Sequence, residues 1–230
     1  MTTQQFQIGR GASVEVYRLG GTRVPPTAQT LTVSNAGSPV LAPATTIPVT
    51  ALAADLEASA ELPLYVSFTN TDGSEVLVEV TAAAAAGDTS LTCTATPGDI
   101  DDGATAPIPA RLLARTAANV NTNSNNVTTT TFDTGGWEDG IVSMNGMTFS
   151  CPGNFLQTDA GWRQCYKGWT EFKNLYLIVT LPAPAGYTTG YKFAAPCDVT
   201  SANIEIPADG IITSPLEFTV RGEPTITDPS

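Results

Sequence analysis

Two pairs of adjacent carboxylates have the residue types for acid–base chemistry: Asp101-Asp102 and Glu138-Asp139. A glycosidase needs two carboxylates on opposite sides of a sugar, and these come from different structural elements. Neighbouring residues of a strand point to opposite faces, so neither pair is placed to act on one bond. We therefore interpret both pairs as solvated charges, and we predict no catalytic residues and no enzyme.

Metal chemistry has little support. The chain has no histidine, which excludes imidazole catalysis and histidine-ligated metals. Asp99, Asp101 and Asp102 offer oxygen ligands for calcium, but the string GDIDDG lacks the spacing and the terminal Glu of an EF-hand loop. We predict no metal site and no cofactor.

The four cysteines also argue against a zinc site, because the gaps between them are 58, 14 and 32 residues and zinc ligands come in close pairs. The first ten residues are polar and show no apolar signal core. Without an export signal we expect reduced, mostly buried thiols. The cysteines are Cys93, Cys151, Cys165 and Cys197.

Charge is scarce and unevenly placed. The 230 residues carry a net charge of −12, and only 14% are charged. An acidic chain is no conventional DNA binder, and no apolar run approaches the roughly 20 residues of a membrane helix. Residues 30–113 hold ten acids and one base, giving −9, and the remainder gives −3. This asymmetry suggests two units of different origin.

The alternation of apolar residues predicts a mainly β chain. Residues 9–19 form a first strand, and residues 30–113 form short strands of a small inserted β domain, with a hairpin turn at Asp72-Gly73. Residues 141–151 form another strand, with Met147, Phe149 and Cys151 on one side. Four further strands are predicted over residues 171–181, 186–194, 198–206 and 212–221.

One helix is predicted over residues 155–169, with Thr158 or Asp159 as its N-cap and Gly168 at its end. Four residues at helical spacing form one apolar stripe, which favours core packing over a sugar-binding platform. The stripe consists of Trp162, Cys165, Tyr166 and Trp169.

Residues 117–134 read NVNTNSNNVTTTT at their centre, are mostly polar and show no apolar period. Asn, Ser and Thr bond to nearby backbone, which favours loops over ladders. A long polar loop in a compact chain is usually functional or disordered. We therefore predict a long loop here.

The segment TTTTFDTGGWEDGIVSMNGMTFSCPGNFLQTDAGWRQCYKGW (residues 128–169) resembles the tail tube (major tail) proteins of long-tailed bacteriophages. The ending DVTSANIEIPADGIITSPLEFTVRGEP (residues 198–224) resembles the last two strands of that family, and residues 9–19 its first strand. The resemblance covers residues 1–29 and 114–230, which would form one discontinuous domain interrupted by the insert 30–113.

The resemblance implies a β-sandwich or barrel with one flanking helix, six copies of which form a ring. Rings stack into the tail tube, through which DNA passes without specific binding. The partners would be other copies, the tape measure, the terminator and the baseplate, with no membrane. The protein would be assembled in the host bacterial cytoplasm and located in the virion tail, with the acidic insert on the tube exterior.

The resemblance also implies roles for individual residues. The loop 117–134 would order against an adjacent ring through its asparagines and an apolar anchor, and Trp137 would contact a neighbouring subunit. Acids would line the lumen so that DNA slides. The loop residues are Asn119, Asn121, Asn123, Asn125, Asn126 and Phe132, and the candidate lumen acids are Glu138, Asp139, Glu171, Glu205 and Glu217.

One alternative stays open from the residues alone. A β-rich module that decorates a virion surface or binds carbohydrate would also explain the acidic insert and the absence of catalytic chemistry.

Overall fold

The computed structural model describes residues 12–19, 27–61, 63–128, 140–171 and 174–230. These residues form antiparallel sheets and one helix, α1 (Ala160–Thr170), which confirms the predicted mainly β fold. None of the described helical residues forms a segment long and apolar enough to cross a membrane. The strands are β1 (Ser13–Arg18), β2 (Gln29–Thr32), β3 (Thr46–Pro48), β4 (Leu64–Thr69), β5 (Glu75–Val80), β6 (Ser90–Thr92), β7 (Thr105–Ile108), β8 (Ala110–Arg111), β9 (Asn119–Thr128), β10 (Gly140–Cys151), β11 (Leu175–Thr180), β12 (Lys192–Ala202), β13 (Leu216–Val220) and β14 (Thr225–Thr227).

The largest sheet has the strand order β8-β1-β11-β12-β13-β10-β9, and β14 pairs with β12 beside β13. The predicted alternation is confirmed in β10 and β13, where Met147, Phe149, Leu216 and Phe218 are all buried. Side chains from β1, β10, β11, β12 and β13 enter one core together with Trp162 of α1. The sheet therefore curls around this core, and the helix takes the place of a second sheet.

The C-terminal strands differ from the prediction in one respect. Residues 186–194 and 198–206 were expected to form two strands, but β12 runs unbroken from Lys192 to Ala202 through Pro196. The part of β12 before Pro196 pairs with β14, and the part after it pairs with β13. Pro196 lies in the gap between these partners and accepts a bond from the Arg221 N–H there. Its missing N–H therefore costs no ladder bond on that side.

Helix α1 begins one turn later than predicted and ends at Thr170. Its N-cap is Asp159, one of the two predicted capping residues; its carboxylate accepts a hydrogen bond from the Trp162 N–H at 3.1 Å. A Cβ added at Gly161 would lie 2.5 Å from the Arg111 carbonyl oxygen, so glycine lets the helix contact β8 directly. Packing, rather than the apolar stripe alone, thus sets the side of the helix that is buried.

The predicted core stripe is half wrong. Trp162 and Cys165 are buried, but Tyr166 is 38% exposed and Trp169 43% exposed. Gly161, Gln164 and Gly168 take the buried side instead, because the small glycines allow close approach to β8 and to Leu175. Tyr166 stacks on Trp162 with ring centroids 5.1 Å apart, and Trp169 follows at 6.0 Å from Tyr166. The aromatic row therefore leaves the core and reaches the surface.

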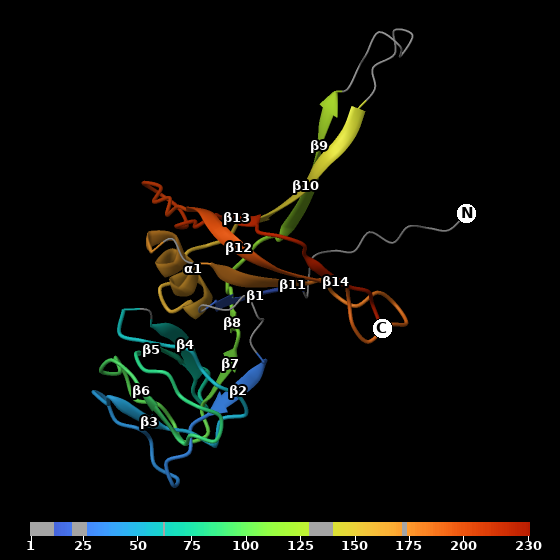
Figure 1. Cartoon of the computed structure of the whole chain (residues 1–230). Helices are drawn as coiled ribbons and strands as arrows, with labels where there is room; N and C mark the ends of the chain where they lie inside the picture. The colour runs from blue at the N-terminus through green and yellow to red at the C-terminus, as the bar shows by residue number, and fades with distance from the viewer. Residues whose placement is uncertain (1–11, 20–26, 62, 129–139, 172–173) are drawn as a thin grey trace, which may run out of the picture.

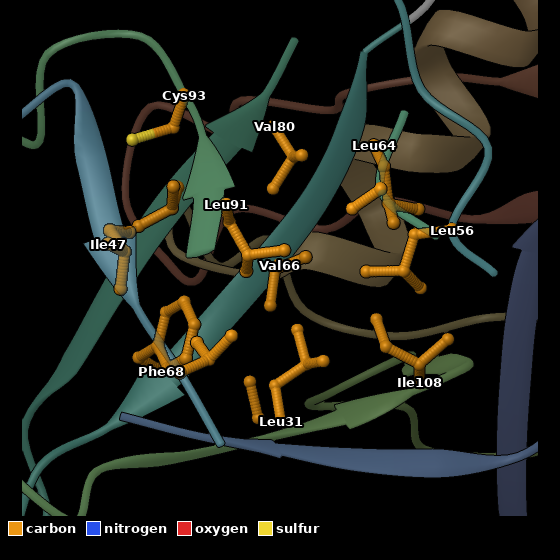
Figure 2. Packing of buried hydrophobic residues seen from close by; sticks show 14 of the residues in the cluster. Leu31, Ile47, Leu56, Leu64, Val66, Phe68, Val80, Leu91, Cys93 and Ile108 are labelled. Atoms are coloured by element: carbon orange, nitrogen blue, oxygen red, sulfur yellow. The ribbon is translucent and has the colours of Figure 1, made fainter. Parts of the chain in front are cut away.

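The inserted strands form their own sheets, with the order β2-β7-β4-β5 in one and β3-β6 in the other. Their facing side chains make a dense apolar core (Figure 2). The predicted Asp72-Gly73 turn joins β4 to β5, and Gly73 has a φ of 83°. Figure 2 labels ten members of this core: Leu31, Ile47, Leu56, Leu64, Val66, Phe68, Val80, Leu91, Cys93 and Ile108.

The insert boundaries differ from those expected from the sequence. Gln29 pairs directly with Ile108, so the two ends of the insert lie side by side. Residues Ala110 and Arg111 were placed in the insert, but they form β8 and pair with β1 of the large sheet. From this pairing we propose residues 29–108 as the bounds of the insert.

The insert is fixed to the rest of the chain. Tyr17, Tyr176 and Ile178 of the large sheet belong to the same buried cluster as the insert core. The Gln164 side chain accepts a hydrogen bond from the Tyr65 N–H at 3.1 Å, which joins α1 to β4. In Figure 1 the insert lies on one side of the large sheet, and α1 contacts both the sheet and β4 of the insert.

Deleting residues 29–108 and joining Ala28 to Pro109 through one glycine is expected to leave a folded large sheet. Its free energy of unfolding should fall by roughly 3 kcal/mol, because Tyr176 and Ile178 lose apolar cover. A deletion of residues 30–113 also removes β8 and should not fold. Circular dichroism and urea unfolding of both products check this; equal behaviour of the two would contradict the boundary at β8.

Candidate functional site

The most distinctive surface feature is a long hairpin formed by β9 and β10. The two strands pair from Ser150↔Asn119 to Gly140↔Thr128, with an irregularity between Val142 and Met144. Only Thr148–Cys151 of β10 also pairs with β13. Beyond that point the hairpin leaves the sheet and projects away from it, on the side opposite the insert (Figure 1).

We call the projecting part the ribbon: residues 122–128 of β9 and 140–147 of β10. Within the described chain each of its strands pairs only with the other. At about 3.3 Å per residue, it extends roughly 25 Å beyond the sheet. An isolated two-stranded hairpin is marginally stable in water, and its free edges are templates for pairing with another chain. Within the described chain the ribbon therefore leaves the outer edge of each of its strands without a pairing strand.

The prediction of a loop over residues 117–134 is wrong for Asn119–Thr128, which is strand β9. The polar side chains do not prevent pairing, because the alternating strand β10 offers a continuous partner edge. Asn119, Asn121 and Asn123 are exposed along this strand. Asn125 and Asn126 pair through their backbones with Met144 and Val142.

A second feature is a polar face at the root of the hairpin. Cross-strand partners there form two rows that continue over β9, β10, β13 and β12. One row is Asn121, Thr148, Thr219 and Asp198, and the other is Asn119, Ser150, Glu217 and Ser201. We call these eight residues the polar face.

The charge of the polar face is negative. Glu217 is exposed on it, and Asp198 forms an ion pair with Arg221, the base that follows β13. Phosphate contacts need free Lys or Arg, so this face offers little attraction to nucleic acid. It is a solvated sheet face whose side chains are small and polar.

The remaining predicted residues do not gather at one place. Glu217 lies on the polar face, whereas Glu205 accepts a bond from the Thr213 hydroxyl at 3.0 Å in the β12–β13 connection. Glu171 follows α1 and pairs with Lys167 at 2.8 Å. Phe132, Trp137, Glu138 and Asp139 lie outside the described residues.

The other acid pair has a structural role. Asp102 accepts hydrogen bonds from the backbone N–H groups of Asn35 and Gly37, and Asp101 accepts one from that of Thr71. These carboxylates hold the loops of the insert together, so they are more than the solvated charges expected. No group of three potential metal ligands occurs among the residues that the structure describes.

The cysteines are free and buried, as expected. Burial raises the pKa of the Cys151 thiol to about 11, and it raises the pKa of Cys165 and Cys197 well above the ordinary value. These thiols stay protonated and unreactive at neutral pH.

Comparison with known proteins decides the family. Residues 99–226, more than half of the chain, match the family model described as "Phage tail tube protein". The chain belongs to the phage tail tube protein family. The match runs from before β7 into β14 and includes both strands of the β9–β10 hairpin. The predicted family is thus confirmed, and the protein is a structural component of a phage-type tail.

Other comparisons add less. Two solved structures share 18% identity and a TM-score of 0.43 with half of this chain. They are a tail of an empty gene transfer agent (GTA) particle with C6 symmetry, covered over 84% of its chain, and the virion of a native GTA particle, covered over 86%. No curated protein matches the chain. The family match alone therefore carries the assignment.

A buried ion pair organises the tail tube subunit behind the polar face. Arg115 donates to the carbonyl oxygens of Ser214 at 2.6 Å, Leu113 at 2.9 Å and Asn154 at 3.1 Å. Its guanidinium lies 3.7 Å from the carboxylate of Asp159, and both side chains are almost fully buried. Asp159 was predicted only as a possible cap and Arg115 was not singled out; an arginine in an Ala-rich stretch gave no periodic signal.

The Arg115–Asp159 pair fixes the crossing segment between β8 and β9. Asp159 accepts the Leu113 N–H at 3.0 Å as well as the Trp162 N–H. Desolvation raises the pKa of Asp159 to about 6, although hydrogen bonds and the Arg115 cation oppose this rise. The start of the helix and the crossing segment thus meet at the Asp159 carboxylate, and Arg115 connects this carboxylate to Ser214 before β13.

The stability of the tail tube subunit should carry a pH signature of Asp159. Its folded pKa of about 6 lies above the ordinary value of 3.8 for an aspartate, so the folded state binds the proton more tightly. The stabilisation from this site is therefore complete below about pH 4 and is lost as pH rises through about 6, by about 3 kcal/mol. Urea unfolding of the native protein and of Asp159→Asn at about pH 4 and about pH 7 measures it. The native protein should lose stability relative to the variant as pH rises; a gain would show that Arg115 outweighs burial.

Proposed function

We propose that this tail tube protein assembles into six-membered rings that stack into a tube, with the β9–β10 ribbon reaching from each subunit to a neighbouring ring. The observation that carries the proposal is the ribbon itself, whose two strands pair only with each other among the described residues. Such a hairpin gains stability when its edges or faces meet another chain. The number six comes from the tail tube resemblance.

The polar face is the candidate lining of the lumen. Its negative charge and its lack of an unpaired base suit a channel through which DNA passes without binding. Among the predicted lumen acids, Glu217 is the candidate that this face supports. Glu171 and Glu205 have partners on other elements.

The insert is proposed to lie on the outside of the tube. Its excess of acids would keep an outer surface soluble. Tail assembly would also bring contacts with the tape measure, the terminator and the baseplate. We propose assembly in the host cytoplasm, location in the virion tail and no catalytic role.

Negative-stain microscopy of the purified, concentrated protein tests the proposal. Rings or tubes with a central channel are the expected result, and image classes should show sixfold symmetry. Addition of double-stranded DNA at physiological salt should give no binding. A protein that stays monomeric at every salt and concentration, and that does not enter a tail, would overturn the proposal.

A further inference from the structure

The connection between β12 and β13 carries an exposed apolar tip. Residues 204–213, which we call the tongue, leave the sheet on the side of α1 (orange-red in Figure 1). Ile206 is 75% exposed and Ile211 68% exposed. Large exposed aliphatic side chains gathered on one loop mark an interaction surface.

The tongue is a built structure rather than a loose loop. Glu205 and Thr213 exchange two backbone hydrogen bonds, of 2.9 and 3.1 Å, which close its base. The Ile212 carbonyl oxygen accepts the Phe155 N–H at 2.9 Å, which ties the tongue to the segment before α1. The apolar tip is therefore held out from the sheet. The two acids of the tongue, Glu205 and Asp209, make its charge −2.

A groove that carries positive charge lies beside the start of β1, the segment between β8 and β9, and the end of β11. It has a volume of about 640 Å³ and is lined by residues 12–14, 111–119 and 181–182. We call it the seam groove. Among the described residues that line it, the charged ones are Arg111 and Arg115, and none is an acid. Leu112, Leu113 and Leu181 give it an apolar wall.

Arg111 is the accessible charge of the seam groove. Its side chain is 60% exposed, and its Nε lies 3.8 Å from the Glu15 carboxylate, a loose contact. Arg115 is buried and engaged with backbone carbonyls. An acidic, apolar projection would thus meet a basic, apolar recess with Arg111 at its surface.

The tongue of one subunit does not reach the far part of its own groove. Leu181 and Pro182 follow the end of β11 that pairs with the beginning of β12, whereas the tongue follows the end of β12. The eleven residues of β12 separate the two by about 35 Å. Two different patches that fit each other on separate copies make a head-to-tail contact, which closes into a ring when the rotation permits.

We infer that the tongue of one copy of this chain docks into the seam groove of the next copy, and that this contact joins subunits within a ring. Ile206 and Ile211 fill the apolar part of the groove, and Asp209 lies near Arg111 of the neighbouring copy. The inference rests on the proposed ring assembly and names the surfaces that form it.

Assembly of the full chain with altered tongues tests the inference. Ile206→Asp combined with Ile211→Asp should keep the circular dichroism spectrum and raise the protein concentration needed for rings at least tenfold. The matched control is Ile226→Asp, an exposed isoleucine of β14 outside the tongue and the groove, which should assemble as the native protein does. Normal ring formation by the tongue variant would overturn the inference.

A charge exchange tests the groove. Asp209→Lys and Arg111→Glu should each weaken ring formation, and the two together should restore it to within about threefold of the native protein. Loss in both single variants without recovery in the double variant would overturn the pairing. Rings formed by the native protein are the reference for these variants. If native rings form but the variants behave otherwise than expected, only this inference fails. If the native protein forms no rings, the proposed function and this inference both fail.

Discussion

Removing the ribbon is expected to stop tube growth while leaving the subunit folded. The variant replaces residues 123–146 by Asn-Gly, which joins the paired residues Thr122 and Met147 by a two-residue turn. The core is untouched, because Met147 and Phe149 stay in place on β10. Rings should still form, but the length of tubes in electron micrographs should fall at least tenfold, since the inter-ring contact is lost. The unfolding midpoint in urea should change little.

The control for this prediction keeps the ribbon and changes an exposed strand residue elsewhere. Thr92→Ser on β6 retains a small hydroxyl side chain at an exposed position outside the ribbon, so tubes should form normally. Tubes of native length from the ribbon deletion would show that the hairpin is not the inter-ring contact. If the deletion variant aggregates and loses the native circular dichroism spectrum while the control does not, the ribbon has a role in folding instead.

Replacing Arg115 by methionine is expected to give the largest loss of stability of any single substitution discussed. The variant leaves the Asp159 carboxylate buried without its cation and removes the donors to the Ser214, Leu113 and Asn154 carbonyl oxygens. Breaking a buried ion pair from one side costs about 3–5 kcal/mol. Urea unfolding at neutral pH should show this cost as a lower midpoint with an unchanged slope.

Two companion variants make the result specific. Within the subunit Arg111→Met loses the exposed pair with Glu15, so at protein concentrations below those of assembly it should change the free energy of unfolding by no more than about 1 kcal/mol. Adding Asp159→Asn to Arg115→Met removes the unpaired charge and should recover part of the loss, as coupled residues do. Strictly additive effects would contradict the direct pairing of Arg115 with Asp159.

Several elements were predictable because their cause is local. The alternation of Met147, Phe149 and Cys151 predicts strand β10, and the alternation of Leu216 and Phe218 predicts β13. The Asp72-Gly73 turn and the Asp159 cap follow from backbone preferences of single residues. The tail tube family was likewise predictable from patterns within residues 128–224, and the family match confirms it.

Other features depended on partners distant in the chain. Asparagine-rich β9 is a strand because β10 supplies a paired edge, not because its own residues favour one. Tyr166 and Trp169 share the helical spacing of Trp162, yet they are exposed because Gly161 and Gly168 bring another side of α1 into contact with the sheet. Short-range spacing cannot distinguish these outcomes.

By itself the sequence determined the mainly β fold, the buried thiols and the tail tube family, since composition and alternation are properties of neighbouring residues. Only the tertiary structure decided where the insert ends, which residues form the polar face, and that Arg115 meets Asp159. The physical reason is that sheet register and buried ion pairs join residues tens of positions apart. Their free energy depends on the three-dimensional surroundings of both partners and not on either segment alone.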